Sequence, residues 1–285
     1  MVGAHFVRAA AGRGLPALPT LSPPRPRITR GVAFRGGSGM NWAEVKISVV
    51  IPAFNEEKLI GATLRSVQAA GAAFGEPGWT EEIVVCDNNS TDRTAELARA
   101  AGARVVFEAV NQIARARNAG AAAAGGEWLV FVDADSRPSR ELFAEVAGEI
   151  QSGRCLAGGC TVRMDERHFL GDFGTGLWNL ISRMRKWTAG SFIFCQTAAF
   201  WKIGGFNGEL FASEEIDLSR RLNKLARQEG KKVVILHRHP LLTSARKLSL
   251  YTPREYFRFC AKAIFQPGKT LKSREECHPW YDGRR

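Results

Sequence analysis

Short apolar runs alternate with longer amphipathic segments from Val45 onward. Residues 47–51 form a β-branched run that stops at Pro52, which predicts a buried strand. Residues 57–70 place apolar side chains at helical spacing and lead to Gly71, which predicts a helix. This order predicts βαβ units and an α/β fold with a doubly wound, mostly parallel sheet. The alternation continues with strands over 83–86, 104–107, 128–132 and 233–236, and with helices over 92–101, 113–124, 140–151 and 216–227.

Polar residues follow three of the predicted strands. The first strand leads into Pro52-Ala-Phe-Asn-Glu-Glu57, the second into Asp87-Asn-Asn-Ser-Thr-Asp92, and the fourth into Asp133-Ala-Asp135. A helix cap or a turn explains any one of these segments by itself. Ligands of parallel sheets bind beyond the carboxyl ends of the strands, so three such segments at one edge indicate a binding site.

Asp133 and Asp135 stand two positions apart after an apolar strand. Alternate residues of an extended chain point the same way, so both carboxylates can converge on one site. Clustered carboxylates repel one another unless a cation is bound. Oxygen ligands shared with substrate phosphates are typical of Mg²⁺, and Mn²⁺ has similar preferences. The pattern therefore predicts a site for Mg²⁺ or Mn²⁺.

Over about residues 46–246 the chain resembles the family 2 glycosyltransferases, which have the A-type nucleotide-sugar transferase fold. The resemblance rests on the three segments above, on Ala116-Arg-Asn-Ala-Gly120, and on Gly204-Gly-Phe-Asn207 followed by Ser213-Glu-Glu-Ile-Asp-Leu218. It implies transfer of a sugar from a nucleoside-diphosphate sugar to an acceptor hydroxyl. It further implies inversion at the sugar and assistance from a divalent metal.

The resemblance also implies roles for individual residues. Asp135 resembles the direct metal ligand, and Asp133 the residue nearer the sugar and ribose. The nucleotide contacts implied by the resemblance are the turn at Pro52, Ala53 and Phe54, then Glu56 at the ribose, Asp87 at the base edge, and Arg117 near the phosphates.

Two assignments stay open. The general base is Glu215 where the family usually has Asp, with Glu214 and Asp217 as alternatives at the start of the same predicted helix. Acidic residues in a first helical turn also stabilise the helix dipole, which is the structural explanation for them. The histidines after the predicted strand at 233–236, His237 and His239, either complete the metal shell or are packed or surface residues; His239 is the metal candidate.

The basic excess lies at the two ends of the chain. The sequence has 40 Lys and Arg against 28 Asp and Glu, a net charge of +12. Residues 1–39 hold six Arg and no acid, and residues 247–285 hold nine basic and four acidic residues, so residues 40–246 are nearly neutral. A basic groove for nucleic acid is therefore not predicted.

The same boundaries divide the chain into three parts. Residues 1–39 are rich in Ala, Gly, Pro and Arg without periodicity, which predicts a disordered basic leader. A translation start at Met40, an organellar transit peptide and a basic tail are alternative explanations for it. Residues 40–246 are the predicted glycosyltransferase domain. Residues 247–285 are a basic extension that packs on this domain or on a membrane surface.

The cysteines and the apolar runs bear on the cellular setting. The six cysteines form no C-x-x-C pair and no Cys/His cluster with zinc spacing. Buried thiols in a reduced cytoplasmic setting are therefore predicted. No apolar run reaches the ~20 residues that a membrane-spanning helix needs.

Residues 169–187 predict an amphipathic helix whose apolar side is formed by Phe173, Leu177, Leu180, Met184 and Trp187. We interpret this stripe as packing against the sheet. The alternative is a peripheral contact with a membrane surface that presents a lipid-linked acceptor, with Trp280 and Tyr281 in the tail as a second contact.

Two other functions are left open by the residues. A nucleotidyltransferase normally opens with a Gly-rich phosphate loop, but here Pro52-Ala-Phe-Asn55 follows the first strand. A non-catalytic nucleotide-sugar-binding protein would bind the donor without transferring the sugar. A dehydrogenase is disfavoured because no G-x-G-x-x-G follows the first strand.

Overall fold

The computed structural model describes residues 45–166, 169–246, 250, 255, 258, 262, 266–277 and 281. The predicted leader 1–39 and Met40 lie outside these residues.

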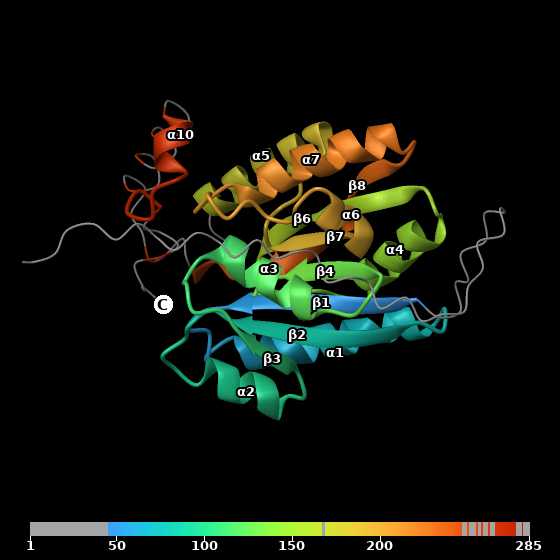
Figure 1. Ribbon diagram of the computed structural model, residues 1–285, viewed down its shortest axis with the longest axis horizontal. Coiled ribbons are helices and arrows are strands. Elements are labelled where there is room, and N and C mark those ends of the chain that lie inside the picture. Colours follow the sequence, from blue (N-terminus) through green and yellow to red (C-terminus); the bar gives the residue numbers. More distant parts are fainter. Residues whose placement is uncertain are drawn as a thin grey trace, which may run out of the picture. The chain divides into compact units, whose positions relative to one another are not determined.

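The first half of the fold follows the predicted order (Figure 1). Each strand is a short apolar run, and each helix carries its apolar side chains at a period that buries one face. The elements are β1 (Lys46–Ala53), α1 (Ile60–Gly75), β2 (Thr80–Asp87), α2 (Thr94–Ala100), β3 (Arg104–Phe107), α3 (Ile113–Ala123) and β4 (Trp128–Val132).

The second half contains strands that the sequence pattern did not predict. Strand β6 contains Gly158 and Gly159, which weaken a strand pattern, and β7 runs directly into a short helix at Thr197. The elements are β5 (Ser136–Arg137), α4 (Arg140–Gln151), β6 (Cys155–Met164), α5 (Phe169–Arg185), β7 (Phe192–Gln196), α6 (Thr197–Lys202), α7 (Glu214–Gln228), β8 (Lys232–Thr243) and α10 (Pro267–Thr270).

The described strands form one mixed sheet in the order β3-β2-β1-β4-β7-β6-β8-β5. Strands β1 to β4 pair in parallel, which confirms the doubly wound part of the prediction. Strand β7 runs antiparallel to both β4 and β6, while β6 and β8 are parallel to each other. The two-residue strand β5 pairs antiparallel with the end of β8.

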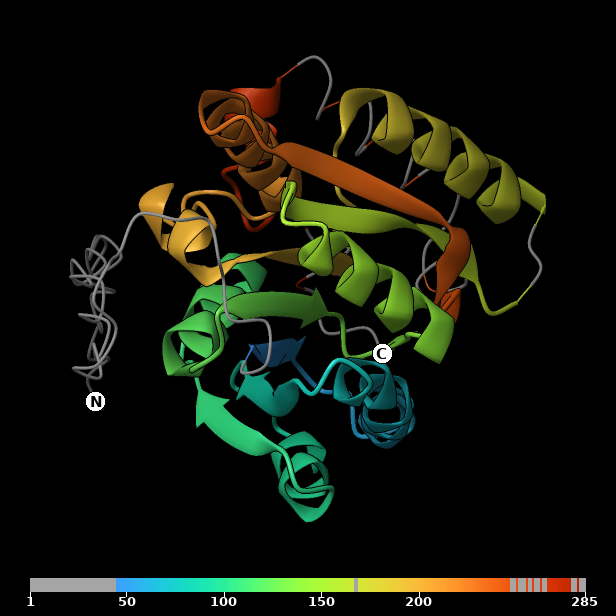
Figure 2. The same ribbon diagram turned by 90° about the vertical axis from the view of Figure 1, so that its right-hand side faces the viewer.

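Helices cover both faces of the sheet, which explains the nearly continuous apolar runs in its strands (Figure 2). In β1, Ile47, Val49 and Ile51 pack on the face that carries α1 and α4. Val50 points to the other face, which carries α3, α6 and α7. The strand ends are therefore held between two packed layers.

Strand β8 extends well beyond the predicted 233–236 and ends only at Thr243. The prediction that His237 and His239 follow a strand is therefore wrong, because both lie inside it. Pro240 does not break the strand, and Leu241 continues the pairing with β6. The residues that do follow the strand are Ser244, Ala245 and Arg246.

The interpretation that the apolar stripe of helix α5 packs against the sheet is wrong, because the helix has the opposite orientation. Its polar side faces the protein: Asn179 accepts from the amide of Val162 and donates to the carbonyl of Val162, and Ser182 is fully buried. Hydrogen bonds to the β6 backbone thus fix the polar face inward. The apolar residues Phe173, Leu177, Leu180 and Met184 are exposed. No helix within the described residues is long and apolar enough to cross a membrane.

Candidate functional site

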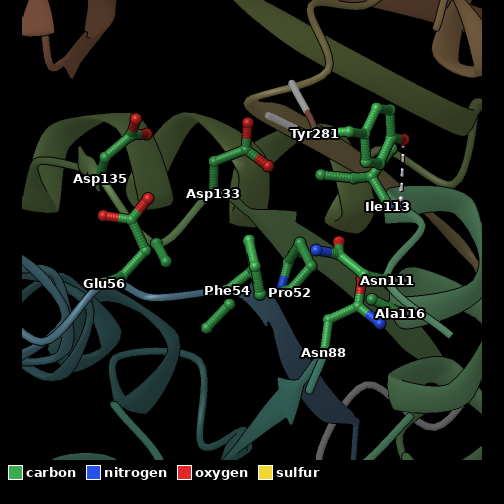
Figure 3. Close-up of a pocket in the computed structure, with 12 residues that line it drawn as sticks. Pro52, Phe54, Glu56, Asn88, Asn111, Ile113, Ala116, Asp133, Asp135 and Tyr281 are labelled. Atoms are coloured by element: carbon green, nitrogen blue, oxygen red, sulfur yellow. Dashed lines mark hydrogen bonds between the residues drawn. The ribbon is translucent and has the colours of Figure 1, made fainter. Parts of the chain in front are cut away.

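The carboxyl ends of the parallel strands open into a cavity (Figure 3). Ala53 at the end of β1 pairs with Asp87 at the end of β2, so both strands stop at the same level. Figure 3 shows Glu56 and Asp135 toward one end of the cavity, Asp133 in the middle, and Tyr281 at the other end. The cavity is lined by Pro52, Ala53, Phe54, Glu56, Asn88, Asn111, Ile113, Ala116, Asp133, Ala134, Asp135 and Tyr281.

The loops after β1 and β2 brace each other at the rim of this cavity. The amide of Asn55 donates to Ser90 Oγ at 3.0 Å, and Asn55 Oδ1 accepts from the amide of Thr91 at 2.8 Å. Asn55 has a φ of 53°, and such left-handed backbone in a non-glycine residue is concentrated at functional sites. The Asn-Glu-Glu and Ser-Thr-Asp segments therefore brace the rim of the cavity, and Glu56 also lines it.

Glu56 lies at the edge of the cavity and is 7% exposed. Arg246, which follows β8, donates to both of its carboxylate oxygens at 2.8 Å. The ion pair ties the first strand end to the last one. It also places a guanidinium beside the residue expected at the ribose.

Asp135 is anchored through its backbone by the distant end of β8. The amide of Ser244 donates to the carbonyl of Asp135 at 3.1 Å, and Ser136 pairs with Thr243. The carboxylate of Asp135 faces the cavity and has a long contact of 3.4 Å from Ser136 Oγ. Asp133 lies two residues earlier in the same cavity, as the alternation predicted.

A metal at this position would need ligands besides the carboxylates of the described residues. Within the described residues, no three His, Cys, Asp or Glu side chains gather into a metal-binding group. Mg²⁺ is usually held by one or two carboxylates together with substrate phosphates and water. Asp135 in an open cavity fits that arrangement, with Asp133 as a neighbouring carboxylate.

Arg117 is bound to the cavity residue Asp133 and is only 2% exposed. Its Nη2 donates to Asp133 Oδ1 at 2.9 Å, and its Nη1 donates to Glu214 Oε1 at 2.6 Å. Although burial by itself lowers the pKa of Arg117, the carboxylates of Asp133 and Glu214 raise this pKa above its usual value. Arg117 therefore binds two site carboxylates. It is absent from the wall of this cavity but lines a second cavity next to it.

A second cavity adjoins the first and shares Asp133 and Ile113 with it. Its wall includes Trp178, Gly190, Glu214 and Glu215. Burial, followed by repulsion from Glu214, raises the pKa of Glu215 to about 8. The carboxyl group of Glu215 thus lies in the wall of the second cavity with an unusually high proton affinity.

The structure does not bring every predicted residue into these cavities. Asp217 lies outside both cavity walls and pairs with Arg221 at 2.6 Å, one helical turn along α7. His239 lies on the side of α4, where its Nδ1 is 2.9 Å from Glu145 Oε1. Four strand residues, roughly 13 Å, separate His239 from Thr243 beside Asp135. Asp87 is buried and accepts from the amide of Ser90, and it is absent from the described cavity wall.

Several residues of the site escaped the sequence analysis. Asn88, and not the predicted Asp87, lies in the cavity wall. Its side-chain amide donates to the carbonyls of Glu108 and Val110 and so holds the 108–112 loop. Trp178 and Tyr281 come from segments with no strand-end signal. The T-shaped contact of Tyr281 with Phe211, at 5.5 Å between ring centres, depends on a tail folding back over the domain. The prediction of Tyr281 as a surface contact is wrong, since it is 9% exposed inside the cavity; Trp280 lies outside the described residues.

Comparison with known proteins gives a consistent result. Residues 48–203 match the family described as Glycosyl transferase family 2. The chain is 27% identical over 221 residues to validoxylamine A glucosyltransferase of Streptomyces hygroscopicus subsp. jinggangensis, which covers 62% of this chain and 51% of that protein. The chain spans about half or less of the length of the first curated relatives it matches.

Solved structures share the fold. Glucosyl-3-phosphoglycerate synthase from Mycobacterium tuberculosis, crystallised with Mn²⁺ and uridine diphosphate, superposes with a TM-score of 0.55 at 21% identity and covers 77% of each chain. A mannosyltransferase from Pyrobaculum calidifontis, in complex with GDP-Man and Mn²⁺, gives a TM-score of 0.56 at 20% identity over 78% of this chain and 64% of that one. The fold is therefore the A-type nucleotide-sugar transferase fold expected from the sequence.

Proposed function

Because the chain belongs to glycosyl transferase family 2, we propose that it transfers a sugar from a nucleoside-diphosphate sugar to an acceptor hydroxyl, with inversion at the anomeric carbon. The observation that carries this proposal is the pair of adjoining cavities that meet at Asp133 and Ile113. Asp135 lines one cavity and Glu215 lines the other. A donor and an acceptor bound on either side of Asp133 would meet there.

The first cavity is the proposed donor site. Pro52, Ala53 and Phe54 would form its wall against the nucleotide, as the resemblance implies. Glu56, which Arg246 holds in place through both carboxylate oxygens, would accept from a ribose hydroxyl. Solved relatives of the same fold were crystallised with uridine or guanosine nucleotides, which supports a nucleotide donor without selecting the base.

We propose Asp135 as the protein ligand of a divalent cation, with Asp133 beside it. A bound Mg²⁺ or Mn²⁺ would supply positive charge to the departing diphosphate. The Mn²⁺ in the two similar structures supports a divalent ion without choosing between the metals. His239 has no part in this proposal because it pairs with Glu145.

The proposed reaction is a single displacement. The acceptor oxygen forms a bond to the anomeric carbon while the bond from that carbon to the diphosphate oxygen breaks. The nucleoside diphosphate leaves with the bonding pair, and the acceptor proton passes to Glu215. Attack from the face opposite the leaving group inverts the configuration.

Contacts within α7 favour Glu215 as the base over its two neighbours. Glu214 is 4% exposed and bound to Arg117, and Asp217 is bound to Arg221. Glu215 lies against Gly190 in the wall of the second cavity, where a β-carbon added at Gly190 would be 3.6 Å from its Cγ and Cδ. Its raised pKa gives it the high proton affinity that an acceptor hydroxyl requires of a base.

We place the protein in the cytoplasm, where nucleotide sugars are available as donors. The five cysteines among the described residues are buried free thiols, which is the pattern of a reducing compartment. The proposed acceptor is a hydroxyl-bearing molecule that fits the second cavity.

A panel of nucleotide sugars with Mn²⁺ tests the proposal. One donor should raise the unfolding temperature of the protein more than the other donors do. The nucleoside diphosphate should be released when a matching acceptor is present. Tight donor binding with no transfer to any acceptor would instead support a non-catalytic binding protein. Release of inorganic pyrophosphate from a nucleoside triphosphate would support a nucleotidyltransferase.

A further inference from the structure

The outer face of helix α5 is an unusual concentration of exposed apolar side chains. We call Phe173, Leu177, Leu180 and Met184 the α5 stripe, and they are 71%, 50%, 54% and 73% exposed. They lie at helical spacings of four, three and four residues, which places them on one face. Four of the five exposed large hydrophobic residues in the described part of the chain belong to this face.

The orientation of the helix is fixed by its polar side. Asn179 bonds to both backbone groups of Val162, and Ser182 donates to the carbonyl of Trp187 from a fully buried position. Rotating the helix to bury the stripe would break these bonds. The α5 stripe is therefore a stable feature of the surface rather than an alternative packing of the helix.

Cationic side chains surround the C-terminal end of the stripe. Arg183, Arg185 and Lys186 are exposed next to Met184, and Arg220 from α7 lies with its guanidinium 5.0 Å from the ring centre of Trp187. None of these four cations has an ion-pair partner among the described residues. The acid of the helix, Asp172, lies in the first turn and lines a separate cavity beside β6.

We propose that α5 docks the protein on a membrane surface with anionic headgroups, with the stripe inserted among the acyl chains. An amphipathic helix with an apolar face and flanking Lys or Arg lies in the plane of the interface. Trp187 beside the cations is suited to the same depth, because aromatic rings concentrate at the headgroup level. The four apolar side chains favour a lipid surface over a nucleic acid, which offers no acyl layer to receive them.

Docking through α5 would also bring the second cavity to the membrane. Trp178 lies one residue from Leu177 and lines the cavity that contains Glu215. An acceptor hydroxyl carried on a lipid could then enter this cavity from the bilayer surface. This consequence rests on the proposed transfer reaction, whereas docking itself does not.

Co-sedimentation of the full chain with vesicles tests the docking. The protein should bind vesicles of phosphatidylcholine and phosphatidylglycerol more tightly than vesicles of phosphatidylcholine alone, and added salt should weaken the binding. Replacing Phe173 and Met184 with Ser should weaken binding by about tenfold for each side chain. Replacing Arg183 and Arg185 with Gln should weaken it by about fivefold for each charge.

Matched variants separate docking from general surface effects. Phe107 on β3 is 62% exposed, so Phe107→Ser removes a comparable apolar side chain from another surface and should leave binding unchanged. Arg99→Gln on α2 is the corresponding control for charge. Equal unfolding temperatures would establish that each variant is folded.

Three results would overturn the proposal. They are no binding to either vesicle, equal binding by the stripe variants and the wild-type chain, and a dimer in sedimentation velocity that the stripe variants abolish. The last result would mean that a second copy covers the stripe. A protein that does not dock but still transfers sugar to soluble acceptors would contradict the docking proposal and leave the proposed reaction standing. A protein that docks but transfers no sugar would contradict the proposed reaction and leave the docking proposal standing.

Discussion

The guanidinium of Arg117 donates to the carboxylate of Glu214 at 2.6 Å in the interior of the protein. The same side chain reaches Asp133 and the carbonyl of Gly190, so it joins α3, the end of β4 and the start of α7. Replacing Arg117 with Met should lower the free energy of unfolding by about 3–5 kcal/mol, because Glu214 would stay buried without its partner. Chemical denaturation measures this change.

Arg115→Met is the control for that substitution. Arg115 lies two residues away on α3 and pairs at 3.1 Å with Glu108, in a more exposed position near the surface. Its loss should be much less destabilising, since partly solvated pairs contribute little. Similar effects for the two variants would show that the Arg117 bridge has no special structural role.

Glu215→Gln should lower kcat by about 10²–10⁴-fold while leaving donor affinity close to that of the wild-type chain, because the amide cannot accept the acceptor proton. Steady-state rates and donor titration measure the two quantities separately. Asp217→Asn is the control, since Asp217 is held by Arg221 outside both cavities, and it should retain most of the rate. Full activity in Glu215→Gln would make the base assignment wrong.

The pKa of Glu215, raised to about 8 by burial and then by Glu214, predicts a pH-dependent rate. The base form is a minority below pH 8, so kcat/KM should rise about tenfold per pH unit in that range and level off above it. Between its ordinary value of 4.5 and about 8 the folded state holds a proton that the unfolded state has lost. The free energy of unfolding should therefore fall as pH rises through this range. Both slopes should flatten in Glu215→Gln.

Asp135→Asn should weaken the dependence of donor binding on Mn²⁺, because a neutral amide is a poorer ligand for a divalent cation. Isothermal titration with and without Mn²⁺ would reveal the loss. Asp165→Asn offers a matched control, since Asp165 is a carboxylate at the end of β6 that pairs with Arg137 at 3.0 Å away from the donor cavity. An unchanged metal dependence in Asp135→Asn would falsify the proposed ligand.

Tyr281→Ala should weaken donor binding by about fivefold or more if its ring stacks on the nucleotide, since such stacking contributes about 1–3 kcal/mol. Tyr281→Phe should bind almost normally, because the ring and its contact with Phe211 remain. Within the described residues, the hydroxyl accepts from the amide of Ile113 at a long 3.4 Å. Equal binding by the Phe and Ala variants would exclude the ring from the donor site.

The sequence predicted β1 to β4 and their helices because each strand is an apolar run and each helix has a clear period. It predicted the cavity at the strand ends because parallel strands bring Pro52, Glu56, Asp133 and Asp135 to one edge. Strand β7 was missed because its antiparallel pairing with β4 depends on long-range contacts rather than on a local pattern.

Two further differences share a physical cause, namely tertiary contacts that outweigh local signals. The hydrogen bonds of Asn179 to the backbone of β6 hold the polar face of α5 inward, whereas the sequence pattern favoured the apolar face. Because β8 pairs with β6 as far as Thr243, it continues past Pro240. His239 therefore lies inside the strand, away from Asp135. Two adjacent carboxylates, Glu214 and Glu215, look alike in the sequence, and only the position of Arg117 distinguishes them.

The pairing of β5 with β8 has a consequence for how the protein is made. Ser136 and Thr243 are 107 residues apart, and the amide of Ser244 holds the carbonyl of Asp135. At about 5–20 residues per second, a ribosome needs about 5–20 s to add that length of chain. Strands β1 to β4 can pair during this interval, but the backbone of Asp135 cannot be fixed until β8 has emerged. The donor cavity is therefore completed only after β8 has been synthesised.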